Sequence, residues 1–133
     1  DKESMPDQYK TVSLEEFVEY SKSMFAYWTE DDFASSFRKM LTIEQFRSEE
    51  MQGLYQQYLS SGPAAYVKDL FESMGIAHAE ENAVRFYATM YFYYSVYDGA
   101  DDKEKVKNEF ASTIGSMAQE WIKQPKLTQI RKS

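Results

Sequence analysis

The chain has 133 residues, enough for one hydrophobic core, and its 43% apolar and 17% aromatic content favours a folded globule over disorder. It contains no cysteine, which excludes disulfides, thiolate metal sites and cysteine catalysis and fits a reducing cytoplasm. The net charge of −7 argues against nucleic-acid binding by this chain alone, because neutralising phosphates requires clustered Lys and Arg.

Basic residues gather at the C-terminal end of the chain. From Lys123 onward there are four of them and no acidic residue (Lys123, Lys126, Arg131 and Lys132). Subtracting these four from the 15 Lys and Arg leaves 11 basic against 22 acidic residues in positions 1–122. We therefore predict a folded domain over residues 1–124 and a basic, solvated tail over residues 125–133. Because the chain starts at Asp1 rather than methionine, we expect a fragment or a processed product.

The hydrophobic pattern is helical almost throughout, without strand-like alternation of useful length. Ser13 and Glu16 form a capping box that predicts the start of a first helix. Thr29 is the predicted cap of a second helix, whose acidic first turn at residues 30–32 suits the positive end of a helix. The positions expected to face inward on these two helices are Phe17, Tyr20, Met24, Tyr27 and Trp28, then Phe33, Phe37, Met40 and Leu41.

Four further helices are predicted along the chain. The third covers about residues 48–60, and the fourth begins with Pro63 at its first position and is capped by Gly75. The fifth covers about residues 80–97 and ends at Asp98-Gly99. The sixth covers about residues 103–123, and Pro125 stops it.

The fifth predicted helix contains the sequence FYATMYFYYSVY at residues 86–97, with seven aromatic side chains and no charge. It has two apolar stripes, one at Phe86, Met90, Tyr93 and Tyr97 and the other at Tyr87, Tyr91 and Tyr94. A surface helix normally has one such stripe, so we expect a partner subunit or a ligand pocket to cover the second. The run is shorter than the roughly 20 apolar residues of a membrane span. With a charged N-terminus unlike a signal peptide, the sequence predicts a soluble, cytoplasmic protein without membrane contact.

Residues suited to catalysis or metal binding are scarce. His78 is the single histidine, which leaves almost no material for a catalytic triad or a zinc site, and we expect it to face solvent near a helix start. Residues 98–102 (DGADD) lack the acid at position 3 and the glycine at position 6 of a calcium loop. No glycine-rich phosphate loop is present. We expect neither an enzyme nor a bound metal or cofactor.

Three segments resemble the C-terminal, effector-binding half of TetR-type bacterial transcriptional regulators. They are FRKMLTIEQFRSEEMQGLYQQYL from residue 37, GPAAYVKDLF from residue 62 and ENAVRFYATMYFY from residue 81. The resemblance covers about residues 33–121. The residues that carry it are Phe37, Arg38, Leu41, Thr42, Glu44, Phe46, Tyr55, Tyr58, Ala83, Phe86, Tyr87 and Tyr91. The helix-turn-helix domain that precedes this half in the family is not in this sequence.

This resemblance implies an all-α fold, an orthogonal bundle of about six helices. It also implies a homodimer in which the last two long helices of each subunit form a four-helix bundle. A small-molecule effector would bind between the helices, and DNA would be bound only through the missing N-terminal domain. The sequence independently favours a twofold dimer. The helix at residues 80–97 has apolar stripes on two sides, and both must pack against other helices. Small residues beside the apolar stripe of the last helix would let another helix approach closely.

Candidate site residues follow from these expectations. Aromatic and methionine side chains of the first, second, fourth and fifth helices are the candidates for a mostly apolar ligand pocket. They are Tyr20, Met24, Tyr27, Trp28, Phe37, Tyr66, Phe86, Tyr87, Met90 and Tyr91. The candidate dimer residues lie on the last two helices. They are Tyr94, Tyr97, Phe110, Ala111, Ile114, Gly115, Met117, Ala118 and Trp121.

The leading functional hypothesis is the effector-sensing and dimerisation domain of a TetR-like regulator that binds a small apolar or aromatic molecule. The alternative is a helical protein–protein interaction module without a small-molecule ligand, which would present an open apolar groove. A third hypothesis is a cofactor-dependent enzyme built on a helical bundle.

Overall fold

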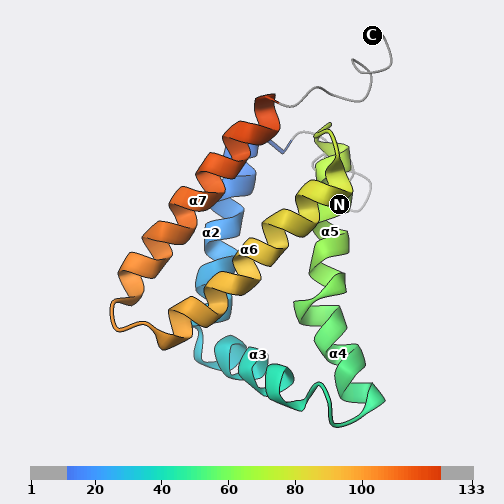
Figure 1. Cartoon of the computed structure of the whole chain (residues 1–133), viewed down its shortest axis with the longest axis vertical. Helices are drawn as coiled ribbons and strands as arrows, with labels where there is room; N and C mark the ends of the chain where they lie inside the picture. The colour runs from blue at the N-terminus through green and yellow to red at the C-terminus, as the bar shows by residue number, and fades with distance from the viewer. Residues whose placement is uncertain (1–11, 124–133) are drawn as a thin grey trace, which may run out of the picture.

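The computed structural model describes residues 12–123, and all regular secondary structure in that range is α-helical (Figure 1). The prediction of an all-α protein is confirmed. The described helices are α2 (Leu14–Glu30), α3 (Asp32–Glu44), α4 (Glu49–Leu59), α5 (Ser61–Ser73), α6 (Ala79–Gly99) and α7 (Lys103–Lys123). None of them is long and apolar enough to cross a membrane. The predicted tail at residues 125–133, including the stop at Pro125, lies outside the described residues.

Several helix ends agree with the sequence. The capping box is present, since the Ser13 hydroxyl accepts from the N–H of Glu16 and the Glu16 carboxylate accepts from the N–H of Ser13, both at 3.0 Å. Gly75 follows α5 with a φ of 77°, a left-handed conformation that favours glycine. The predicted last helix has the same bounds as α7.

The boundary between α2 and α3 differs from the prediction. Thr29 is not a cap but a buried residue inside α2, and its hydroxyl donates to the carbonyl oxygen of Phe25 at 2.6 Å. Asp31 caps α3 instead, because its carboxylate accepts from the N–H of Ala34 at 2.9 Å. Both residue types cap helices, and Asp is the stronger N-cap of the two.

The junction between α4 and α5 is a bend at Ser60, which ends one helix and begins the next, and the two helices run end to end (Figure 1). Pro63 is therefore the third residue of α5 rather than the first, still within the turn where a helix needs no N–H donor. Gly62 allows the two helices to meet closely, since a Cβ there would clash with the backbone carbonyl of Gln57.

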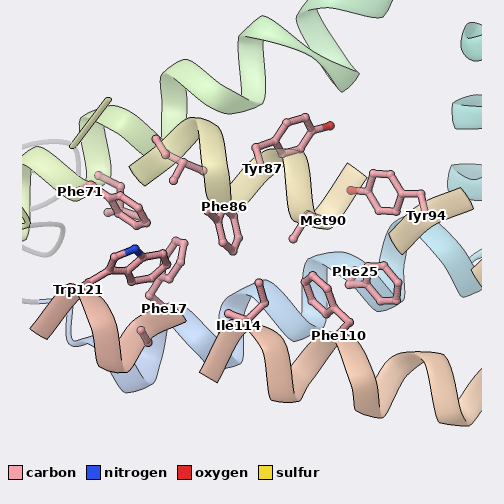
Figure 2. Close-up of a cluster of buried hydrophobic side chains, with 14 of the residues drawn as sticks. Phe17, Phe25, Phe71, Phe86, Tyr87, Met90, Tyr94, Phe110, Ile114 and Trp121 are labelled. Atoms are coloured by element: carbon pink, nitrogen blue, oxygen red, sulfur yellow. The ribbon is translucent and has the colours of Figure 1, made fainter. Parts of the chain in front are cut away.

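The main core lies between α2, α5, α6 and α7 and is rich in aromatic rings. Figure 2 shows Trp121 and the phenylalanines of the other three helices gathered around one end of it. The ring centroids of Phe71 and Trp121 are 4.7 Å apart, and those of Phe17 and Phe86 are 5.0 Å apart. Further along, Phe25 stacks on Phe110 at 4.3 Å.

This core includes most of the residues assigned to a dimer interface from the sequence. Six of the nine are covered within one chain: Tyr94, Tyr97, Phe110, Ile114, Ala118 and Trp121. The other three, Ala111, Gly115 and Met117, are half-buried. The six buried side chains are not available to a second subunit in this conformation, because α2 already packs against the face of α6 and α7 that carries them.

Helix α3 contributes to a smaller cluster around Leu41, Tyr55 and Leu59. Two of its residues predicted to face inward, Phe33 and Met40, are exposed instead, Phe33 to 73%. The reason is that α3 is covered along one narrow side only, where its buried residues follow the spacing i, i+4 and i+7.

Candidate ligand cavity

A cavity of about 250 Å³ lies between α2, the α4–α5 junction and α6. Gln57 and Tyr58 line it from the end of α4, and Gly62 and Pro63 line it from the start of α5. The bend at Ser60 therefore places four positions around the helix junction on one wall. The aromatic cluster of the main core, represented by Phe17 and Phe86, borders the cavity at one end.

Seven of the ten pocket residues predicted from the sequence line this cavity. They are Tyr20, Met24, Trp28, Tyr66, Phe86, Tyr87 and Met90. They come together because residues four or seven apart share one face of a helix, and the faces of α2 and α6 that carry them point toward each other.

The other three predicted pocket residues lie elsewhere. Tyr27 is half-exposed and packs edge-on against Trp28. Phe37, on α3, contacts Tyr58 of α4, with ring centroids 5.3 Å apart. Tyr91 lies on another side of α6, where its hydroxyl is hydrogen-bonded to that of Tyr55.

Eight lining residues were not among the sequence candidates: Phe17, Ser21, Gln57, Tyr58, Gly62, Pro63, Val67 and Tyr94. Half of them belong to the helix junction. The Gly-Pro pair between two tyrosines at Tyr58 and Tyr66 marks this junction in the sequence, but the pair alone does not indicate that the bend opens onto a cavity.

The cavity wall is apolar, and none of its described lining residues is charged. Its buried polar groups are satisfied by the protein. The Ser21 hydroxyl donates to the carbonyl oxygen of Phe17 at 2.8 Å, and the Tyr87 hydroxyl donates to that of Leu59 at 2.6 Å. Burial raises the pKa of both Tyr87 and Tyr94 above the ordinary value, so both phenols stay neutral. An ionised ligand would lose its hydration here without gaining a counter-charge.

The size of the cavity sets the scale of a ligand. An apolar cavity of about 150 Å³ holds benzene. A volume of about 250 Å³ therefore suits a molecule of one or two rings. Rings of this kind can stack on the aromatic wall, and the thioethers of Met24 and Met90 adapt to irregular shapes.

The residues considered for metal binding do not gather in the structure. His78 is exposed at the N-cap of α6, with a left-handed φ of 55°. Within residues 12–123, no three His, Asp or Glu side chains are grouped to hold a metal ion. Asp98 instead forms an ion pair with Arg38 at 2.8 Å.

Comparison of the chain with models of known families, with curated proteins and with solved structures gave no match. The resemblance to TetR-type regulators therefore remains a prediction that depends on the quoted residues.

Proposed function

We propose that this chain binds a small, uncharged aromatic molecule in the cavity between α2, the α4–α5 junction and α6. The observation that carries the proposal is the cavity itself, a half-open hollow lined by aromatic and methionine side chains, with no charged residue among its described lining residues. Binding sites for small molecules are typically concave and apolar, with a few polar groups that fix the orientation of the ligand. Gln57 and the hydroxyl of Tyr20 can serve that purpose here.

The proposed biological context is effector sensing in a TetR-like transcriptional regulator. Its support is the resemblance over residues 33–121 and the acidic charge of this chain, which suits a domain that leaves DNA binding to another. In such a protein the ligand would act by favouring one arrangement of the dimer over another.

A homodimer belongs to the same proposal, with α6 contributing its outward face. Val84, Ala88 and Phe92 follow each other at intervals of four residues, and all three are exposed, Phe92 to 62%. They border a groove of about 520 Å³ between α6 and the α4–α5 junction. In the proposed dimer, the second subunit would pack on this exposed face rather than on the buried stripe of α6.

The alternative function is a helical module that binds a protein partner. The observation in its favour is the exposure of Phe33, Ile43 and Phe46 on and just after α3, with Phe46 exposed to 85%. A contiguous patch of exposed apolar side chains often marks a protein interface, and Ile43 and Phe46 lie three residues apart in the sequence. This alternative predicts that the cavity binds no small molecule.

Calorimetric titration with 1-naphthol, a neutral two-ring probe, tests the proposal. Wild type is expected to bind one equivalent per chain. Met24→Trp fills the cavity and should weaken binding at least about tenfold, since inserted ring volume displaces the probe. Ser23→Trp places the same side chain on the exposed side of α2 and should bind like wild type. Equal binding by both variants, or none by wild type, would contradict the proposal.

A further inference from the structure

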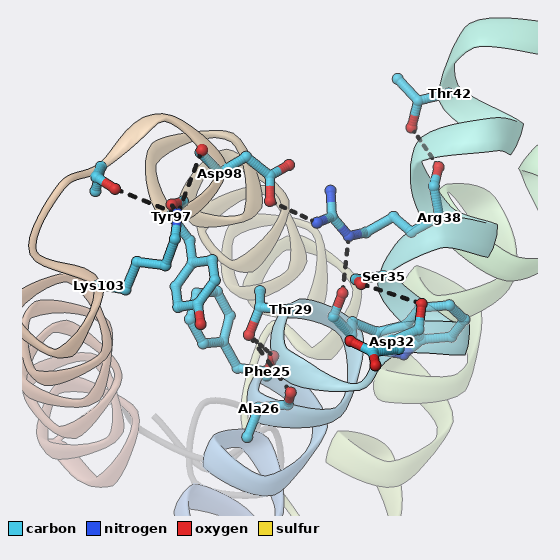
Figure 3. Close-up of polar contacts among 12 residues, drawn as sticks. Phe25, Ala26, Thr29, Asp32, Ser35, Arg38, Thr42, Tyr97, Asp98 and Lys103 are labelled. Carbon is cyan, nitrogen blue, oxygen red and sulfur yellow. Dashed lines mark hydrogen bonds and ion pairs between the residues drawn. The ribbon is translucent and has the colours of Figure 1, made fainter.

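Arg38 is almost wholly buried, 4% exposed, and joins α3 to two other helices (Figure 3). Its Nε donates to the carbonyl oxygen of Trp28 at 3.0 Å, and its Nη2 donates to Oδ1 of Asp98 at 2.8 Å. Its guanidinium also lies over the ring of Tyr94, 4.9 Å from the centroid. One side chain of α3 thus contacts the last turn of α2 and the last two turns of α6.

The charged guanidinium of Arg38 can be buried because these contacts pair its donors. Neither α2 nor α6 has a basic residue in its last turn, and the end of a helix carries partial negative charge. At α6 the Nζ of Lys103 donates to the carbonyl oxygen of Tyr97 at 2.8 Å, and at α2 the carbonyl oxygen of Trp28 accepts from Arg38. Burying a guanidinium is unfavourable unless its donors are paired. Arg38 therefore stays inside only while α2, α3 and α6 keep their relative positions.

Two of the three Arg38 partners belong to the cavity wall. Trp28 and Tyr94 both line the cavity, and Arg38 binds the backbone carbonyl of Trp28 and lies over the ring of Tyr94. A molecule that contacts the Tyr94 ring therefore touches a side chain that itself contacts the guanidinium.

Helix α3 makes few other contacts with α6. Its buried residues besides Arg38 are Ala34 and Leu41, whereas Phe33 and Ile43 are exposed. Leu41 packs against Tyr55, in the middle of α4, and Leu59, the last residue of α4. Loss of the Arg38 contacts would therefore remove much of what attaches α3 to α6, and an element with few buried contacts opens easily.

We propose that Arg38 couples occupancy of the cavity to the position and rigidity of α3. The inference rests on the proposed ligand binding. A ligand against Trp28 and Tyr94 holds both residues where Arg38 binds them, which favours the docked state of α3. Coupling between two sites is reciprocal: if the ligand favours docking of α3, docking raises ligand affinity by the same factor, so a variant in which α3 undocks must bind the ligand more weakly.

Hydrogen exchange with and without 1-naphthol tests this coupling. In wild type the probe should slow exchange in α3 at least about fivefold, and also in the wall segment of α5 around Tyr66. Asp98→Ala removes the ion pair and should abolish the effect on α3 while the α5 segment stays protected. Asp98→Asn keeps an acceptor oxygen and should retain part of the effect. Asp101→Ala, an exposed acid in the following loop, is the control and should behave like wild type.

A second variant avoids dependence on Asp98. Arg38→Lys keeps the charge, but a single ammonium cannot reproduce the forked geometry of the guanidinium. It should also abolish the response of α3 and weaken 1-naphthol binding at least about fivefold. Circular dichroism establishes that each variant is folded.

The outcomes are distinguishable. Protection of α5 without any response of α3 in wild type would overturn the coupling and leave the proposed ligand binding intact. An equal response of α3 in wild type, Asp98→Ala and Arg38→Lys would likewise overturn the coupling alone. No protection anywhere would overturn both the coupling and the proposed function.

Discussion

The hydroxyl of Tyr87 donates a hydrogen bond to the carbonyl oxygen of Leu59 at 2.6 Å, which ties the middle of α6 to the end of α4. Leu59 is the last residue of α4, and its carbonyl has no partner in a continuing helix because the chain bends at Ser60. The ring of Tyr87 lines the cavity on one side and the outer groove on the other. This one contact thus holds the bend and the cavity wall together.

Replacing Tyr87 with Phe should lower the free energy of unfolding by about 1–3 kcal/mol, because a buried carbonyl group loses its donor. Chemical denaturation measures the change. Tyr27→Phe removes a half-exposed hydroxyl and should stay within about 0.5 kcal/mol of wild type. Equal effects of the two substitutions would show that the contact with Leu59 contributes nothing.

Gly62→Ala should destabilise the protein by about 1–3 kcal/mol, since the new Cβ would meet the backbone of Gln57 and force α4 and α5 apart. Gly53→Ala is the matched control inside α4, where a Cβ has open space. It should instead stabilise the helix by about 0.5–1 kcal/mol. Thermal unfolding of both variants gives the comparison, and a neutral Gly62→Ala would contradict the close approach of the two helices.

Phe110→Ala and Phe92→Glu should affect different properties. Phe110 stacks on Phe25 in the core, so its loss should reduce stability by about 3–5 kcal/mol. Phe92 is exposed on the outward face of α6, and a charge there should disrupt the proposed dimer while the chain stays folded. Light scattering should find wild type at twice the chain mass of 15.6 kDa and Phe92→Glu at that mass. A monomeric wild type at micromolar concentration would contradict the dimer.

Stability should fall at high pH because of buried tyrosines. Burial, and then the hydrogen bond with Tyr55, raises the pKa of Tyr91 from 10.0 to about 12, and burial also raises the pKa of Tyr87 and Tyr94. The unfolded chain therefore releases these protons first. The stability they provide is complete below pH 10 and is lost as the pH rises toward 12.

Denaturation midpoints at about pH 8 and about pH 11 test this pH dependence. Tyr91→Phe should lessen the decline, whereas Tyr27→Phe, with its half-exposed side chain, should leave it unchanged. An unchanged midpoint between the two pH values in wild type would contradict the account.

Local patterns in the sequence predicted the helices and much of the cavity. The capping box at Ser13 and the left-handed glycine at Gly75 are recognisable because each depends on a few neighbouring residues. Met24 and Trp28, or Phe86 and Met90, are four residues apart, so their shared helical face is evident without a structure.

Long-range features could not be predicted in this way. Arg38 is buried because Asp98, 60 residues away in the sequence, lies beside it. Phe33 has the spacing of a core residue but lies where no other helix within residues 12–123 covers α3. The two stripes of α6 are evident in the sequence, but which side needs a partner depends on how α2 and α7 pack, and short-range periodicity does not encode that.

The methionines allow the most direct test of the central claim, that an uncharged aromatic molecule binds inside the cavity. Of the seven in the chain, Met24 and Met90 line the cavity, whereas Met40 and Met51 lie on α3 and α4 away from it. Methyl NMR of methionine-labelled protein during titration with 1-naphthol should show saturable ring-current shifts at Met24 and Met90, with one common dissociation constant. Unchanged signals from these two methyl groups, or shifts confined to Met40 and Met51, would contradict the account.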